Sequence, residues 1–154
     1  MIPYFRHFPV ADLHLPHLNP LMGGVQQCRG GYSFGPVMRR YYILEYVLRG
    51  RGRYTTGGHT YAVGEGEAFI IKPFEAHLLV ADETDPWAYV WVGFTTDLTL
   101  PGLLAENDVF DAAFCADVFL RLADGNEKSR TAADYAAEIY GVFARCYATE
   151  STVA

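Results

Sequence analysis

The segment from Val37 to Thr95 constrains the fold more than any other, because it alternates short runs of β-branched and aromatic residues with turn residues. Glycine, aspartate or proline closes each run, and Gly57-Gly58 is a two-residue link of the kind used in tight hairpins, since glycine tolerates a positive φ. The expected strands are Val37–Leu48, Arg53–Thr56, His59–Val63, Ala68–Lys72, His77–Ala81 and Trp87–Thr95. Strands joined by short turns, with no helix between them, form an antiparallel sheet that must curl or double over to hide its edges. We therefore expect a mainly β fold, either a barrel or a two-sheet sandwich.

The segments on either side of these strands have a different character. Residues 1–35 are rich in proline, histidine and glycine and show no sustained helical or strand period, which predicts an N-terminal arm. Residues 36–96 then form the barrel, and residues 97–154 form a helical segment. The chain is thus expected to have three parts around one fold unit, as its length of 154 residues allows.

Two helices are expected in the helical segment. The first is Asn107–Ala123, which is apolar on nearly all sides, as a helix packed against the barrel would be, and which ends at Gly125-Asn126. The second begins near Ser129, a good N-cap residue, and runs to about Thr149.

The second helix carries small and apolar residues at the spacing of a coiled-coil seam. Intervals of 4, 3, 4 and 3 separate Ala132, Ala136, Ile139, Phe143 and Cys146. Two heptads leave two alternatives open, because such a seam can pack on the chain's own barrel or on the same helix of a second copy. In the second alternative, Ala136, Ile139 and Phe143 form the interface of a homodimer.

Composition limits where the protein acts and what it contacts. Hydrophobic residues make up 51% of the chain, but no apolar run approaches the roughly 20 residues that a membrane span needs, so we expect no membrane association. The start of the chain lacks a secretory signal pattern, and the three cysteines are widely spaced, so reduced thiols and a cytoplasmic location are expected. Residues 101–154 contain nine acidic and four basic residues, which argues against contact between the helices and nucleic-acid phosphates.

The run from Tyr41 to Phe94 resembles the amino-terminal sensor domain of AraC-type transcription regulators. The matching features are Arg49-Gly50-Arg51-Gly52, the segment from Tyr61 to Gly66, Pro73 with His77, and the aromatic stretch from Asp85 to Phe94. The resemblance implies a cupin-like jelly roll, an antiparallel β-barrel, that senses a small-molecule effector, with a sugar as the favoured class. It also implies a homodimer that binds DNA only through a helix-turn-helix domain missing from this chain. A stand-alone carbohydrate-binding module is a further possibility.

Alternation along the expected strands defines a candidate ligand-binding face. Tyr89 and Trp91 lie on one face of their strand, where aromatic rings with polar edges suit a sugar-like molecule, and Trp91 matches a tryptophan that packs against the ligand in relatives. Arg39 and Glu45 share a face of the first strand, and they are pocket residues if that face points inward rather than to solvent. The resemblance adds His77 and Leu79, at positions that relatives use for ligand contacts. The predicted ligand-binding residues are therefore Arg39, Glu45, His77, Leu79, Tyr89 and Trp91.

Catalysis has no comparable set of residues. Metal-binding cupins resemble one another in a His-x-His pair with a glutamate and in a second motif with one more histidine, whereas here only His77 has a counterpart and His59 lies beside a turn. One histidine does not make a transition-metal site, which usually needs three ligands. We therefore expect no metal, no cofactor and no catalytic residues, so the chain is predicted not to be an enzyme. The alternative is a metal-dependent cupin enzyme, such as an isomerase or a dioxygenase.

Overall fold

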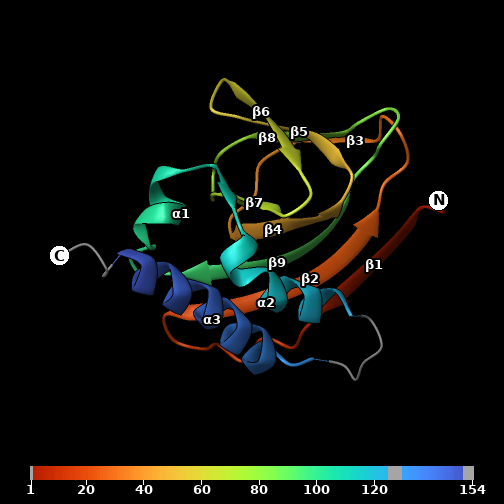
Figure 1. The fold of residues 1–154 in the computed structure, drawn as a ribbon. Helices are drawn as coiled ribbons and strands as arrows, with labels where there is room; N and C mark the ends of the chain where they lie inside the picture. The colour runs from red at the N-terminus through yellow and green to blue at the C-terminus, as the bar shows by residue number, and fades with distance from the viewer. Residues whose placement is uncertain (1, 125–129, 151–154) are drawn as a thin grey trace.

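The computed structural model describes residues 2–124 and 130–150, which form three layers (Figure 1). A six-stranded sheet lies in the middle, a four-stranded sheet covers one of its faces, and helices cover the other. The six-stranded sheet has the order β1 (Tyr4–Pro9), β2 (Leu18–Gln27), β9 (Ala88–Thr96), β4 (Tyr42–Arg49), β7 (Glu67–Ile71) and β10 (Val109–Asp111). The four-stranded sheet has the order β3 (Ser33–Val37), β8 (His77–Ala81), β5 (Arg51–Thr56) and β6 (His59–Gly64). Neighbouring strands pair antiparallel, and the predicted mainly β, cupin-like fold followed by helices is confirmed.

Alternation along the central strands divides the core in two. In β4, Leu44 packs in the cluster under the helices, whereas its neighbour Ile43 packs in the cluster between the sheets. In β9, Val90 and Val92 belong to the helix side and Tyr89 to the inter-sheet side. Both faces of this sheet are therefore buried, which explains why these strands are so rich in apolar residues.

The expectation of an N-terminal arm without strands is wrong, because β1 and β2 lie within residues 1–35. Strand β2 pairs with β9 along its length, and β1 pairs with β2 from Tyr4 opposite Gln27 to Pro9 opposite Met22. Glycines and Pro20, which stands beside a register shift, break the apolar alternation that would have predicted a strand. The sheet thus extends well beyond residues 36–96.

The predicted strand Val37–Leu48 is a continuous strand only from Tyr42 onward in the structure. Strand β3 ends at Val37, β4 begins at Tyr42, and the residues between them pass from the four-stranded to the six-stranded sheet. This crossing brings Arg39 and Tyr41 to the space between the sheets rather than onto a strand.

The predicted helix Asn107–Ala123 is helical mainly in its second half. The described chain after β9 forms α1 (Gly102–Glu106), then β10, a 3₁₀ turn η1 (Ala113–Cys115) and α2 (Ala116–Ala123). Strand β10 pairs with β7, which places the ring of Phe110 in the core as a strand residue. The predicted helix end at Gly125-Asn126 lies outside the described residues.

Helix α3 (Ala132–Glu150) packs its seam against its own sheet. Thr131 caps the helix, because the amide of Asp134 donates to Thr131 Oγ1 at 3.2 Å and the amide of Thr131 donates to Asp134 Oδ2 at 2.7 Å. The predicted cap, Ser129, lies outside the described residues. The predicted interface residues Ala136, Ile139 and Phe143 are only 8%, 1% and 1% exposed in the single chain. Their assignment to a homodimer interface is therefore corrected, since the chain's own core occupies them.

None of the helices in residues 2–124 and 130–150 combines the length and the apolar character needed to cross a membrane.

Candidate functional site

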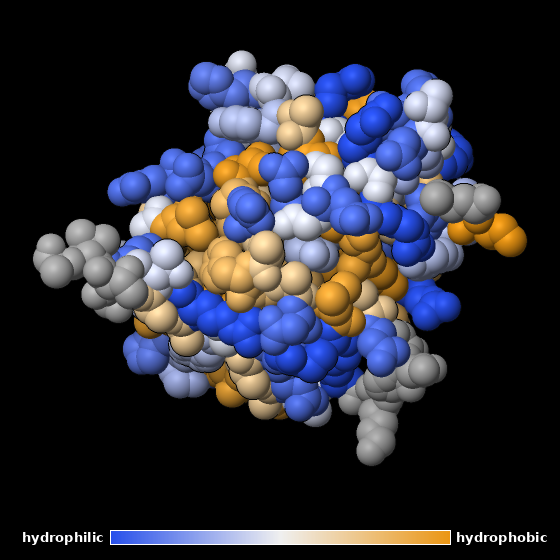
Figure 2. All heavy atoms as spheres, viewed as in Figure 1, coloured by the Kyte–Doolittle hydropathy of each residue, from blue (hydrophilic) through white to orange (hydrophobic). Residues whose placement is uncertain are grey.

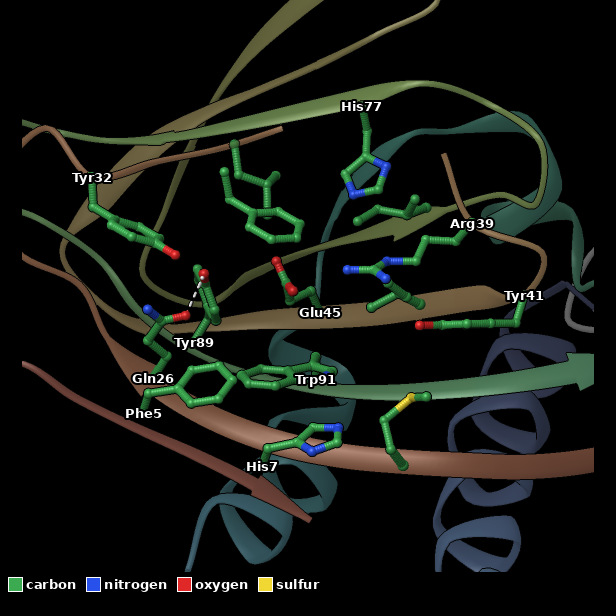
Figure 3. Close-up of a pocket in the computed structure, with 15 residues that line it drawn as sticks. Phe5, His7, Gln26, Tyr32, Arg39, Tyr41, Glu45, His77, Tyr89 and Trp91 are labelled. Carbon is green, nitrogen blue, oxygen red and sulfur yellow. Dashed lines mark hydrogen bonds between the residues drawn. The ribbon is translucent and has the colours of Figure 1, made fainter. Parts of the chain in front are cut away.

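A cavity of about 380 Å³ lies between the two sheets, a size within the range of small-molecule sites (Figure 3). The six-stranded sheet forms its floor, and residues of β3 and β8 form its roof. The structure brings all six predicted ligand-binding residues to its wall: Arg39, Glu45, His77, Leu79, Tyr89 and Trp91. The face of the first strand that carries Glu45 points into the cavity and not to solvent.

Aromatic rings form much of the floor. The indole of Trp91 lies over Gly24 of β2, where a Cβ atom would stand only 2.1 Å from the ring. The ring of Tyr89 meets Trp91 edge-on, with 5.9 Å between centroids and 73° between planes. The Tyr89 hydroxyl donates to Gln26 Oε1 at 3.0 Å, which fixes the phenol against β2. These contacts hold the indole against the sheet, so that its free face can pack on the C–H surface of a ligand.

Three polar side chains point into the cavity from different elements. Arg39 enters from the β3–β4 connection, Glu45 from β4 and His77 from β8 (Figure 3). Arg39 Nε, Glu45 Oε2 and His77 Nδ1 are buried without a hydrogen-bond partner in the described part of the chain. Buried polar atoms are nearly always paired in folded proteins, and an unpaired one costs about 1–3 kcal/mol. A ligand with several hydroxyl groups would satisfy all three.

Burial sets the charges in the cavity. It raises the pKa of Glu45 to about 8, so this carboxyl is mostly protonated at pH 7 and can donate as well as accept a hydrogen bond. Burial also lowers the pKa of His77, aided by the positive charge of Arg39, which favours the neutral form of its ring. The guanidinium of Arg39 carries the positive charge and lies over the rings of Phe34 and Tyr41, 5.5 and 6.0 Å from their centroids.

Sequence reasoning missed the cavity residues contributed by the first two strands. Phe5 and His7 of β1, with Met22 and Gln26 of β2, line the cavity, although the sequence predicts an arm for their segment. Phe5 and His7 are two residues apart, and Met22 and Gln26 are four apart, so each pair can share one face of a strand. Each run is too short for this spacing to predict a strand. The other residues that the prediction left out are Tyr32, Phe34, Tyr41, Ile43 and Ile71.

The chemical groups in and beside the cavity limit the chemistry that it can support. Residues 2–124 and 130–150 contain no group of three or more His, Cys, Asp or Glu that could hold a metal ion. The Cys28 thiol is buried beside this core, and burial raises its pKa to about 11, so it is not an activated thiolate. The arrangement can bind a polar molecule through hydrogen bonds and aromatic packing.

Two operon regulatory proteins are similar in sequence to this chain. The Msm operon regulatory protein of Streptococcus mutans is 32% identical over 104 residues, covering 68% of this chain and 35% of that protein. The raffinose operon transcriptional regulatory protein RafR of Pediococcus pentosaceus is 28% identical over 91 residues, covering 58% of this chain and 33% of that protein. The matched segment thus spans about a third of the length of these relatives.

Solved structures are similar at lower sequence identity, and a family model also matches the chain. KdgF from Halomonas sp. has a TM-score of 0.46 and 21% identity, covering 60% of this chain and 81% of that one. A cupin superfamily protein from Desulfitobacterium hafniense has a TM-score of 0.47 and 9% identity, covering 60% and 78%. Residues 19–124 match the AraC-like ligand binding domain, from β2 through both sheets to the end of α2, and the chain therefore belongs to that family.

Proposed function

We propose that this chain is the effector-sensing domain of a transcription regulator, that its effector is a small saccharide bound in the cavity between the sheets, and that it is not an enzyme. Contacts with DNA are made by a domain outside the matched segment, and the regulator works as a homodimer in the cytoplasm. The contact between the two copies involves residues other than Ala136, Ile139 and Phe143, because these three are buried in the core of the single chain.

The observation that carries this proposal is the set of three unpaired polar atoms facing an aromatic floor. Saccharide hydroxyls both donate and accept hydrogen bonds, so they can satisfy Arg39 Nε, Glu45 Oε2 and His77 Nδ1 together. A protonated Glu45 argues against a cationic ligand, because the cavity then holds no carboxylate that would pair with a cation. A sugar ring also presents C–H groups on one of its faces, and this face packs on the ring of Trp91.

The relatives support the regulatory part of the proposal. Both are named as operon regulators, and one is named for raffinose, an oligosaccharide. The described side chains do not support a metal-dependent cupin enzyme, because they include no group of three or more residues that could hold a metal ion. His77 alone has a counterpart in the histidine motifs of metal-binding cupins.

Thermal unfolding with added compounds tests the proposal. A ligand at 100 times its Kd stabilises the folded state by about 2.7 kcal/mol, which raises the Tm of a chain of this size by roughly 5–10 °C. We expect at least one saccharide in a panel of neutral sugars and small carboxylic acids to do so. Trp91→Ala should abolish the shift in Tm. Thr60→Ala should retain it, because Thr60 lies in β6 of the four-stranded sheet and does not line the cavity. A panel in which no sugar raises the Tm, or only acids do, contradicts the saccharide assignment.

A further inference from the structure

The cavity continues from its buried end to the edge of the six-stranded sheet along one row of paired residues. His7 of β1 stands opposite Gly24 of β2, Gly24 opposite Trp91 of β9, and Trp91 opposite Glu45 of β4. Neighbouring strands lie about 4.8 Å apart, so this row of three spacings is about 14 Å long. It begins at the buried carboxyl of Glu45 and ends at the exposed side chain of His7.

Phe5 extends the aromatic floor at the open end of this row. Its ring lies beside Trp91, with 5.7 Å between centroids and 28° between planes, so the two rings form one nearly continuous platform (Figure 3). His7 continues it, with its ring 6.4 Å from that of Phe5 and 10° from parallel. Phe5 is nevertheless 61% exposed, although the strand places it at the cavity rather than on the far face. An exposed aromatic ring continuing a ligand platform is a typical contact surface for a further apolar face.

We propose that Phe5 and His7 form an outer subsite, which takes the second ring of an oligosaccharide whose terminal ring lies between Trp91 and Glu45. This inference rests on the proposed function. A single six-membered ring cannot contact both ends of the row, whereas two linked rings can. The buried polar atoms are at the inner end, so the terminal ring makes most of the hydrogen bonds. The outer end offers mainly the faces of Phe5 and His7, so the second ring contributes through packing.

Calorimetric titration with two matched sugar series tests the outer subsite. One series is galactose, melibiose and raffinose, and the other is glucose, maltose and maltotriose; within each series the terminal ring is constant. We expect the disaccharide of the recognised series to bind more tightly than its monosaccharide. Phe5→Ala should weaken disaccharide binding by about threefold to tenfold more than it weakens monosaccharide binding, because an aromatic contact contributes about 0.5–1.5 kcal/mol.

Phe114→Ala is the matched control, since Phe114 is also a partly exposed phenylalanine but lies in η1, on the helix side of the molecule. It should leave all affinities unchanged. Equal affinity for monosaccharide and disaccharide, or an equal loss for both in Phe5→Ala, overturns the outer subsite while the proposed function stands. Failure of every sugar in both series to bind overturns the proposed function itself. The Tm of unliganded Phe5→Ala should match that of the parent, and a large fall would show that the ring serves folding instead.

Discussion

At the scale of single residues, Glu45 combines a position in the cavity wall with a cost to stability. Its side chain is 4% exposed, Oε2 has no hydrogen-bond partner in the described chain, and burial raises its pKa from 4.5 to about 8. Arg39 and His77 share the cavity with it, from the β3–β4 connection and from β8, and neither makes a hydrogen bond or ion pair with its carboxyl that would hold it charged. The protein keeps an acid here that an apolar residue could replace more cheaply, as expected of a ligand contact.

Glu45→Gln should stabilise the unliganded protein, increasingly so as the pH rises. Below pH 4.5 the carboxyl is protonated in both the folded and the unfolded chain and contributes no pH dependence. Between pH 4.5 and about 8 only the unfolded chain releases the proton, so the free energy of unfolding of the parent falls as the pH rises, and above that range it levels. At pH 8 the free energy of unfolding of Glu45→Gln should exceed that of the parent by on the order of 4 kcal/mol. Thermal or urea unfolding from pH 4 to pH 9 measures it.

Glu65→Gln is the control, because Glu65 lies exposed in the turn between β6 and β7. It should not change the pH profile. A parent and a Glu45→Gln variant with parallel profiles would mean that Glu45 is ionised in the folded state.

At the scale of elements, β2 separates the ligand cavity from helix α3 with two glycines. A Cβ on Gly23 would stand 2.6 Å from the Tyr135 hydroxyl of α3, and a Cβ on Gly24 would stand 2.1 Å from the ring of Trp91. Successive residues of a strand face opposite sides, so one glycine admits a ring from the helix layer and the next admits a ring from the cavity. The two positions share a strand but serve different layers.

Alanine at these two positions should therefore give different defects. Gly24→Ala pushes Trp91 off the strand, so we expect altered tryptophan fluorescence and loss of saccharide binding. Gly23→Ala displaces Tyr135 and should lower stability by about 1–3 kcal/mol, the usual cost of overpacking, with less effect on binding. Fluorescence, Tm and titration distinguish them. Gly141→Ala in α3 meets no atom within 4 Å and should stabilise the chain by up to about 1 kcal/mol. Equal binding losses in both β2 variants would contradict the division between layers.

The same elements show how far the sequence predicts this structure. Alternation in β9 predicted the cavity face of Tyr89 and Trp91, because each of these side chains packs on one side of a buried sheet, and the succession of short strands and turn residues predicted the fold class. Strand β2 could not be predicted, since its small residues are explained by rings of Trp91 and Tyr135 that arrive from distant parts of the chain. The spacing of apolar residues in α3 predicted an apolar face. It could not predict the surface that this face packs against, because that surface depends on where the helix lies in the folded chain. Whether the six cavity residues bind a ligand stays a prediction.

At the scale of the whole molecule, the helix layer completes the core of the six-stranded sheet. Hydrophilic side chains gather over α2 and α3 on the outside of this layer (Figure 2). They include ion pairs that join the two helices, such as Arg121 with Glu138 at 3.0 Å and Arg145 with Asp117. These pairs are largely exposed and contribute little each, so the stability of the layer depends on the apolar residues beneath them.

Phe143→Ala and Tyr140→Ala should separate core packing from self-association. Phe143 is 1% exposed and its ring packs on Phe94 with 6.2 Å between centroids, so its loss should cost about 3–5 kcal/mol and lower the Tm by roughly 10 °C. Tyr140 of α3 is 43% exposed, and its loss should change the stability of a single chain by less than about 0.5 kcal/mol. Unfolding at two protein concentrations tenfold apart adds the second readout, because the Tm of a homodimer rises with concentration. Phe143→Ala should lower the Tm equally at both concentrations. A variant that keeps the parental Tm but loses its concentration dependence would instead return Phe143 to the interface between two copies.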